Sequence, residues 1–154
     1  MSRGGPAAAA LATAGLVVAV DQATKQLIDS KIARGDSVEV FFGLDLTNTR
    51  NTGVAFGALQ GAGLIVAILI GLSLALLIGY FVANRDMPLL WLPTGLLLGG
   101  AAGNLIDRAT EGAVIDWIDP VAWPAFNIAD ACIVVGVASL LWVVEGSSRR
   151  QRES

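Results

Sequence analysis

The feature that most constrains this chain is a set of four long apolar segments within only 154 residues. The clearest is "GAGLIVAILIGLSLALLIGYFVA", which carries no charge from Gly61 to Ala83. A helix needs about 20 apolar residues to cross a bilayer. The pattern therefore predicts one all-α membrane domain over residues 1–154, with four transmembrane helices at about 7–28, 61–83, 87–107 and 126–145.

The first apolar segment has a second interpretation. Arg3 precedes the run from Pro6 to Val20, and "ATA" at 12–14 resembles the small-residue cleavage site of a signal peptide. That site would fall inside the apolar run, whereas cleavage normally follows the run. We therefore interpret the segment as a membrane span that continues into "DQATKQLI", and keep cleavage as the alternative.

Composition narrows the chemistry that the chain can perform. There is no histidine, which excludes histidine-based triads and histidine-ligated zinc. Cys132 is the single cysteine, and its apolar neighbours "ACIVVG" favour a packing role. Carboxylates, lysine and hydroxyl groups remain as candidate catalysts.

The connections between spans indicate the orientation. Four spans place both termini on one side, and the connections on that side are short and arginine-rich, which favours a cytoplasmic location. The long connection at about 30–60 mixes β-branched and aromatic residues with Gly and Asn, so we expect a small β-cradle on the outer surface. The second outer connection holds Trp117 and Trp123, which favour the membrane interface.

Polar residues gather at the outer ends of three predicted spans. They form helically spaced sets, namely Asp21 with Lys25, Asn104 with Asp107 and Arg108, and Asn127 with Asp130. Charged groups inside spans normally pair or line a wet cavity. A purely structural pairing remains an equal alternative for Asp21, Lys25, Asp107 and Arg108.

Asp116 and Asp130 are harder to explain by local pairing, because no obvious cation remains for both. Two carboxylates in a poorly solvated site do not both ionise easily, so such a pair supplies an acid and a base. The ionised member would activate water and the protonated member would donate a proton. Asn104 and Asn127 suit a supporting role, and which aspartate is the base stays open.

The chain resembles the lipoprotein signal peptidases, or signal peptidase II, a family of bacterial membrane aspartic peptidases. Five blocks in the family's order carry the resemblance, namely "DQATK", "RNTGVAFG", "GGAAGNLIDR", "VIDWID" and "FNIAD". The resemblance implies that Asp116 and Asp130 are the catalytic dyad and that Asn127 supports it. It also implies that the family's remaining polar positions shape the site and contact substrate: Asp21, Lys25, Asn51, Asn104, Asp107 and Arg108.

The resemblance further implies a substrate and a setting. The substrate would be a diacylglyceryl-modified prolipoprotein, cut on the amino side of its lipidated cysteine. We expect no metal or organic cofactor, no nucleic-acid partner, contact with membrane lipid, and a monomer. The location would be the bacterial inner membrane, with cytoplasmic termini and an active site near the outer face. The family architecture adds a short outer helix or loop after the third span, and a loop at 112–124 is a candidate lid.

Two other functions compete with the peptidase interpretation. A proton-coupled carrier also places carboxylates in its spans, but it would distribute them through the depth of the bilayer. An anchor or assembly protein would use small-residue seams such as "GLLLGGAAG". Neither accounts for "NTGVAFG" or for the spacing of Asn127 and Asp130.

Overall fold

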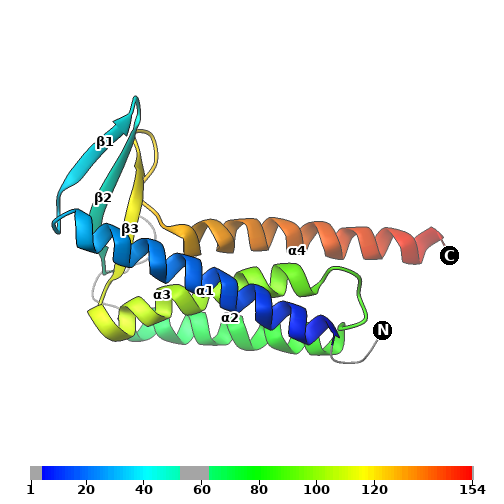
Figure 1. Cartoon of the computed structure of the whole chain (residues 1–154). Coiled ribbons are helices and arrows are strands. Elements are labelled where there is room, and N and C mark those ends of the chain that lie inside the picture. Colours follow the sequence, from blue (N-terminus) through cyan, green and yellow to red (C-terminus); the bar gives the residue numbers. More distant parts are fainter. Residues whose placement is uncertain (1–4, 53–62, 154) are drawn as a thin grey trace.

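The structure is a computed structural model that describes residues 5–52 and 63–153. Most of these residues are helical, and a small sheet lies at one end of the helices (Figure 1). In chain order the elements are α1 (Gly5–Lys31), β1 (Ser37–Phe41), β2 (Leu44–Asn51), α2 (Gly63–Ala83), α3 (Trp91–Glu111), β3 (Val114–Pro120) and α4 (Ile128–Glu153). Each helix overlaps one of the four predicted spans.

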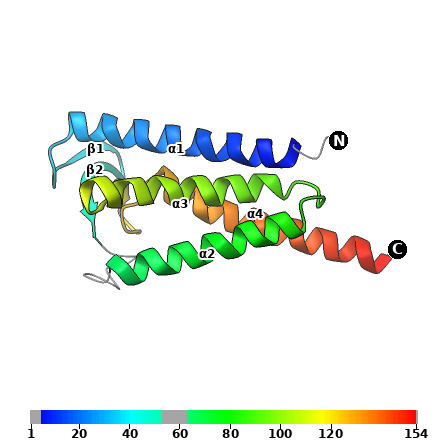
Figure 2. The ribbon, with the colours of Figure 1, turned by 90° about the horizontal axis from the view of Figure 1, so that it is seen from below.

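The helix α3 lies at the centre of the bundle, packed against α1 on one side and α4 on another (Figure 2). Glycines on α3 make this close approach possible. A Cβ atom on Gly99 would lie 2.7 Å from the Cβ of Val17 in α1, and one on Gly100 would lie 2.5 Å from the carbonyl oxygen of Ala129 in α4. Small residues of this kind let helix backbones approach where the surrounding lipid offers no hydrophobic driving force.

Two described helices are long and apolar enough to cross a membrane by length and composition, Gly5–Lys31 and Ile128–Arg149. A shorter apolar helix runs from Ile68 to Ala83. The α3 helix is more polar, since it carries the Asn104, Asp107 and Arg108 set near its C-terminal end. Spanning by all four helices therefore remains a prediction.

The sheet has three antiparallel strands in the order β1, β2, β3. The strands β1 and β2 form a hairpin within the predicted 30–60 region, and Phe42 and Gly43 make its turn. Gly43 has a φ of +86°, in the left-handed region that glycine adopts without strain. Residues 53–62, including the "GVAFG" part of the "RNTGVAFG" block, lie outside the described residues.

The second outer connection differs from the expectation. A short helix was predicted after the third span, but residues 114–120 form β3, which pairs with β2 across a chain separation of more than 60 residues. The helix α3 ends at Gly112, whose φ of +72° reverses the chain and whose N–H donates to the carbonyl of Arg108. The alternating residues that follow, beginning at Val114, then extend along the free edge of β2.

Candidate active site

Asp116 lies on β3 and is held by two amides. Its Oδ1 accepts a hydrogen bond from Nδ2 of Asn127 at 2.8 Å, and its Oδ2 accepts one from Nδ2 of Asn51 on β2 at 3.0 Å. The side chain is only 3% exposed. Strand pairing between β2 and β3 brings Asn51 beside Asp116, although 64 residues separate them in the chain.

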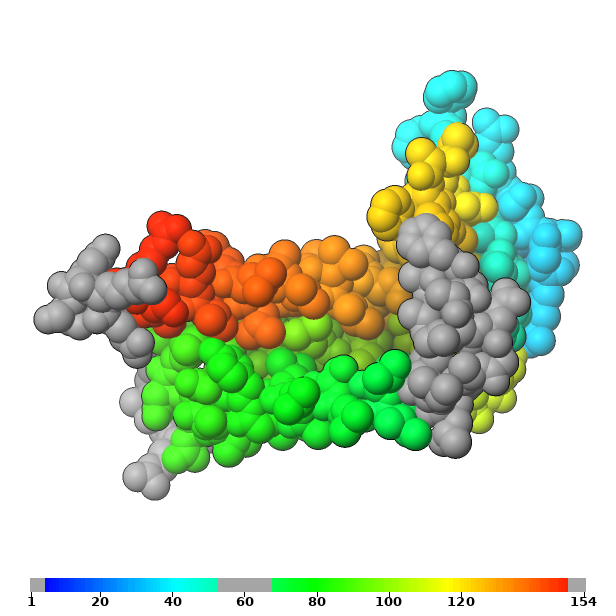
Figure 3. Space-filling view, turned by 180° about the vertical axis from the view of Figure 1, so that it is seen from behind, coloured from blue at the N-terminus to red at the C-terminus, as the bar shows by residue number. Residues whose placement is uncertain are grey.

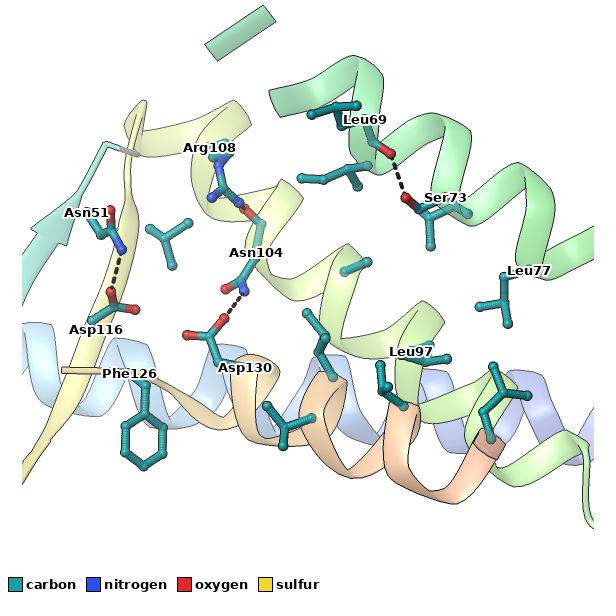
Figure 4. A pocket seen from close by; sticks show the side chains of 18 of the residues that line it. Asn51, Leu69, Ser73, Leu77, Leu97, Asn104, Arg108, Asp116, Phe126 and Asp130 are labelled. Carbon is teal, nitrogen blue, oxygen red and sulfur yellow. Dashed lines mark hydrogen bonds between the residues drawn. The ribbon is translucent and has the colours of Figure 1, made fainter. Parts of the chain in front are cut away.

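Asp130 lies in the first turn of α4, where it takes part in a reciprocal cap. The N–H of Asp130 donates to Oδ1 of Asn127 at 2.9 Å, and the N–H of Asn127 donates to Oδ2 of Asp130 at 3.3 Å. This is the geometry of a capping box, which satisfies the free N–H groups at a helix start. The other Asp130 oxygen accepts from Nδ2 of Asn104 at 2.8 Å (Figure 4). The cap fixes the carboxylate against α3.

Asn127 connects the two aspartates. It is fully buried, caps α4 through its Oδ1, and donates from Nδ2 to Asp116. The same Nδ2 lies 3.2 Å from Oδ1 of Asn104 and 3.2 Å from the carbonyl oxygen of Ile115. One side chain thus sets the position of β3 relative to the start of α4, and with it the position of one carboxylate relative to the other.

Lys25 lies beneath this arrangement and is 1% exposed. Its ammonium group contacts three acceptors, which are Oδ2 of Asp21 at 2.8 Å, Oδ2 of Asp107 at 2.8 Å and Oδ1 of Asn104 at 3.0 Å. An ammonium group has three N–H donors, so each donor has a partner. The pairing that the sequence predicted between Asp21 and Lys25 is present, and Asp107 joins it.

Each carboxylate bound to Lys25 also holds the backbone beside one member of the dyad. Asp21 accepts from the N–H of Ala129 at 3.0 Å, directly before Asp130. Asp107 accepts from the N–H of Ile115 at 3.0 Å, directly before Asp116. Lys25 therefore anchors both strands of chain that carry the aspartates.

The environment of Asp116 changes its acidity. Burial raises its pKa from 3.8 to about 6, and the nearby charge of Asp130 contributes in the same direction. The hydrogen bonds from Asn51 and Asn127 oppose this rise by favouring the ionised form. A carboxyl group with such a pKa exchanges its proton near neutral pH, which suits acid–base catalysis.

The dyad opens on a cavity of about 890 Å³ that extends along the helices (Figure 4). Its polar end contains Asn51, Asp116, Asn104, Arg108 and Asp130. The rest is lined by apolar side chains of α2, α3 and α4, among them Leu69, Leu77, Leu97, Ile133 and Leu140. The site therefore combines two carboxylates with a long apolar space.

A family model described as "Signal peptidase (SPase) II" matches residues 13–144. The chain belongs to this family. It is therefore a signal peptidase II family protease.

Named relatives and solved structures agree with this assignment. The peptidase is 41% identical over 131 residues to the lipoprotein signal peptidase of Moorella thermoacetica, covering 82% of this chain and 86% of that protein. It is 40% identical over 154 residues to the lipoprotein signal peptidase of Syntrophus aciditrophicus, covering 93% and 94%. A solved bacterial membrane enzyme superposes with a TM-score of 0.85 at 32% identity, covering 94% of this chain and 92% of that one.

All nine predicted site residues of the peptidase lie in one region. Asp116, Asp130, Asn127, Asn104 and Asn51 form the hydrogen-bonded centre described above. Lys25, Asp21 and Asp107 form the buried charge cluster behind it. Arg108 lines the cavity, and its Nη1 lies 3.2 Å from the carbonyl oxygen of Asn104.

The sequence reading missed two further polar residues. Gln22 donates to Oδ1 of Asp107 at 2.8 Å and to the carbonyl of Gly103 at 3.2 Å. Asn48 is fully buried, and its Nδ2 donates to the carbonyl of Ile32 at 2.7 Å, which ties β2 to the end of α1. Gln22 stands inside the "DQATK" block, so that block was the available signal. Among the described residues, no group of three or more Asp, Glu, Cys or His side chains is placed to hold a metal ion.

Proposed function

We propose that this peptidase removes the signal peptide from diacylglyceryl-modified prolipoproteins and cuts on the amino side of the lipidated cysteine. The observation that carries the proposal is the juxtaposition of a hydrogen-bonded aspartate pair with a long apolar cavity. The family assignment supports the same activity, because the relatives are lipoprotein signal peptidases.

The two aspartates divide the chemistry between them. One, ionised, takes a proton from a water molecule as that water attacks the carbonyl carbon of the scissile peptide bond. The other, protonated, donates to the carbonyl oxygen and later allows the leaving amine of the cysteine to be protonated. Asn127 keeps the two carboxyl groups in register through its bonds to both.

The apolar cavity accounts for the substrate class. Diacylglyceryl chains and the signal helix are hydrophobic, and each CH₂ moved out of water contributes about 0.8 kcal/mol. The cavity is lined by α2 and α4 side chains, such as Leu77 and Val137, that match such groups. Substrate would enter laterally from the bilayer, and its polar lipobox backbone would meet Asn51, Asn104 and Arg108.

The membrane arrangement belongs to the same proposal. All four helices span the inner membrane, both termini are cytoplasmic, and the dyad lies near the outer face, where water reaches it. The enzyme acts as a monomer that needs no added cofactor, and the 112–124 segment closes over the bound substrate. In the structure this segment comprises β3 and the turn after it.

The test compares cleavage of a diacylglyceryl-modified lipobox peptide by the wild type, Asp116→Asn and Asp130→Asn in lipid vesicles. Loss of acid–base catalysis should lower turnover by about 10²-fold to 10⁴-fold. Substrate binding, measured in parallel, should change little because the amide is nearly isosteric.

Asp119→Asn is the matched control, because Asp119 lies on the same strand as Asp116 but outside the cavity lining. It should cleave at the wild-type rate. Near wild-type turnover by either dyad variant would contradict the assignment of that aspartate.

A further inference from the structure

Cross-strand pairing gives the sheet two chemically different faces. Paired residues on neighbouring strands share a face, and successive residues along a strand alternate between faces. The strand pairs form three rows, which are Val38–Leu46–Ile118, Glu39–Asp45–Asp119 and Phe41–Leu44–Pro120. The first and third rows are apolar and share one face, because Leu44 and Leu46 are two residues apart. The middle row consists of three carboxylates and lies on the other face.

A bulge at the edge of the sheet preserves this separation. The register between β1 and β2 shifts between Glu39 and Phe41, so Val40 is the extra residue and Phe41 pairs with Leu44. Without the shift, Phe41 would fall on the face of Glu39. The bulge places an aromatic side chain with the apolar rows.

The apolar face looks along the helix bundle. Val114 and Asp116 precede Ile118 by four and two residues on β3, so they share its face, and both line the cavity beside residues of α2 and α4. The sheet extends past α4 at roughly a right angle to it (Figure 1), and Figure 3 shows the resulting L-shaped outline. The outer part of the apolar face therefore overhangs the flank of α4.

Nothing among the described residues covers this overhanging part. Val38 is 53% exposed and Phe41 is 65% exposed, and Phe42 at the hairpin turn is 97% exposed. The flank of α4 below is also apolar and open, with Val134 at 68% and Leu141 at 67%. Two apolar surfaces thus meet at an inside corner.

We propose that the apolar face of the sheet rests on the outer surface of the lipid bilayer beside α4, with Phe41 and Phe42 at the depth of the lipid headgroups. This inference rests on the membrane placement of the helices in the proposed function. Lipid is the occupant that fills both sides of the corner at once, since bilayer around α4 would continue beneath the sheet. Glu39, Asp45 and Asp119 then face water, where carboxylates are well solvated.

This docking has a consequence for the reaction. The inner end of the sheet is tied to the helices by Arg50, which pairs with Asp29 on α1. The outer end would be supported by lipid. Asp116 lies between the two supports, so the sheet would hold it at the depth where a membrane-anchored cysteine presents its peptide bond.

Neighbouring residues on opposite faces provide a matched test. In full-length protein carrying Cys132→Ala, Val38→Cys and Glu39→Cys are each labelled with an environment-sensitive fluorophore and reconstituted in phosphatidylcholine vesicles. Quenching is measured with shallow spin-labelled lipid and with aqueous iodide. We expect the Val38 probe to be quenched several-fold more by lipid than the Glu39 probe, and the reverse for iodide. Val134→Cys on α4 reports that the helices are inserted.

Each other outcome overturns the proposal. Equal iodide quenching at both positions would mean that the sheet stands clear of the bilayer. A Val38 probe shielded from both quenchers would mean that protein, such as a second copy, covers the face. Loss of lipid quenching at Val134 would remove the membrane placement itself. Cleavage is measured separately on the unlabelled Cys132→Ala protein, so failure of the proposed activity would be seen without affecting the quenching result.

Discussion

At the scale of single residues, Lys25 has the largest structural task. It neutralises Asp21 and Asp107, which are 0% and 3% exposed. We expect Lys25→Met to cost about 3–5 kcal/mol of stability, because it leaves two buried carboxylates without their cation. Thermal unfolding in detergent measures this loss. Lys31→Met, on an exposed position of the same helix, is the control, and equal unfolding temperatures for the two variants would contradict the prediction.

The same substitution tests the positioning role of Lys25. At a temperature where Lys25→Met remains folded, turnover should fall more than substrate affinity, because the variant loosens the backbone beside Asp116 and Asp130. A variant that unfolds more readily but retains the wild-type turnover would limit Lys25 to stability.

The pKa of Asp116 gives a second prediction for single residues. Removing the hydrogen bond from Asn51 in Asn51→Ala should raise this pKa above about 6, because that bond favours the ionised form. Removing the like charge in Asp130→Asn should lower it. Isotope-edited infrared titration of the carboxyl band measures both shifts, and shifts of the same sign would contradict the electrostatic account.

The elevated pKa also fixes the sign of a stability effect. Ionisation of Asp116 is harder in the folded state than in the unfolded state, so its contribution to stability is present below pH 3.8 and is lost as the pH rises through about 6. The catalytic carboxyl group thus reduces stability at the pH where it would work.

At the scale of elements, close helix packing depends on glycine. A methyl group on Gly99 would lie 2.7 Å from the Cβ of Val17 and 2.8 Å from the carbonyl of Ala14. We expect Gly99→Ala to cost about 1–3 kcal/mol, since the backbones of α1 and α3 must move apart. The measurement is the unfolding temperature in detergent.

Gly71 supplies the matched control for this prediction. A Cβ atom there meets nothing within 4 Å, so Gly71→Ala in α2 should be neutral or raise stability by about 0.5–1 kcal/mol. Equal effects of the two substitutions would show that helix propensity, and not helix contact, governs the response.

At the scale of the whole molecule, both termini lie at one end of the bundle and the sheet lies at the other (Figure 1). In a Cys132→Ala background, we expect a membrane-impermeant thiol reagent added outside intact spheroplasts to label Ser37→Cys but not Ser148→Cys. Permeabilised cells should show labelling of both, because both positions are exposed. Outside labelling of Ser148→Cys alone would reverse the proposed orientation.

The sequence by itself determined the helices and the identities of the polar residues. Hydrophobic runs mark helices because their length and composition are local properties, and the spacing of Asn127 and Asp130 already contained the capping box that begins α4. The pair of Asp21 and Lys25, four residues apart on one helix, was accessible for the same reason.

The tertiary structure decided how these residues meet. The pairing of β3 with β2, which brings Asn51 to Asp116, depends on contacts between residues far apart in the chain, and the local pattern at 114–120 had been assigned to a helix or loop. The second partner of Lys25, Asp107, comes from another helix. The division of the sheet into an acidic and an apolar face required the register and the bulge at Val40, because a shift of one residue exchanges the faces.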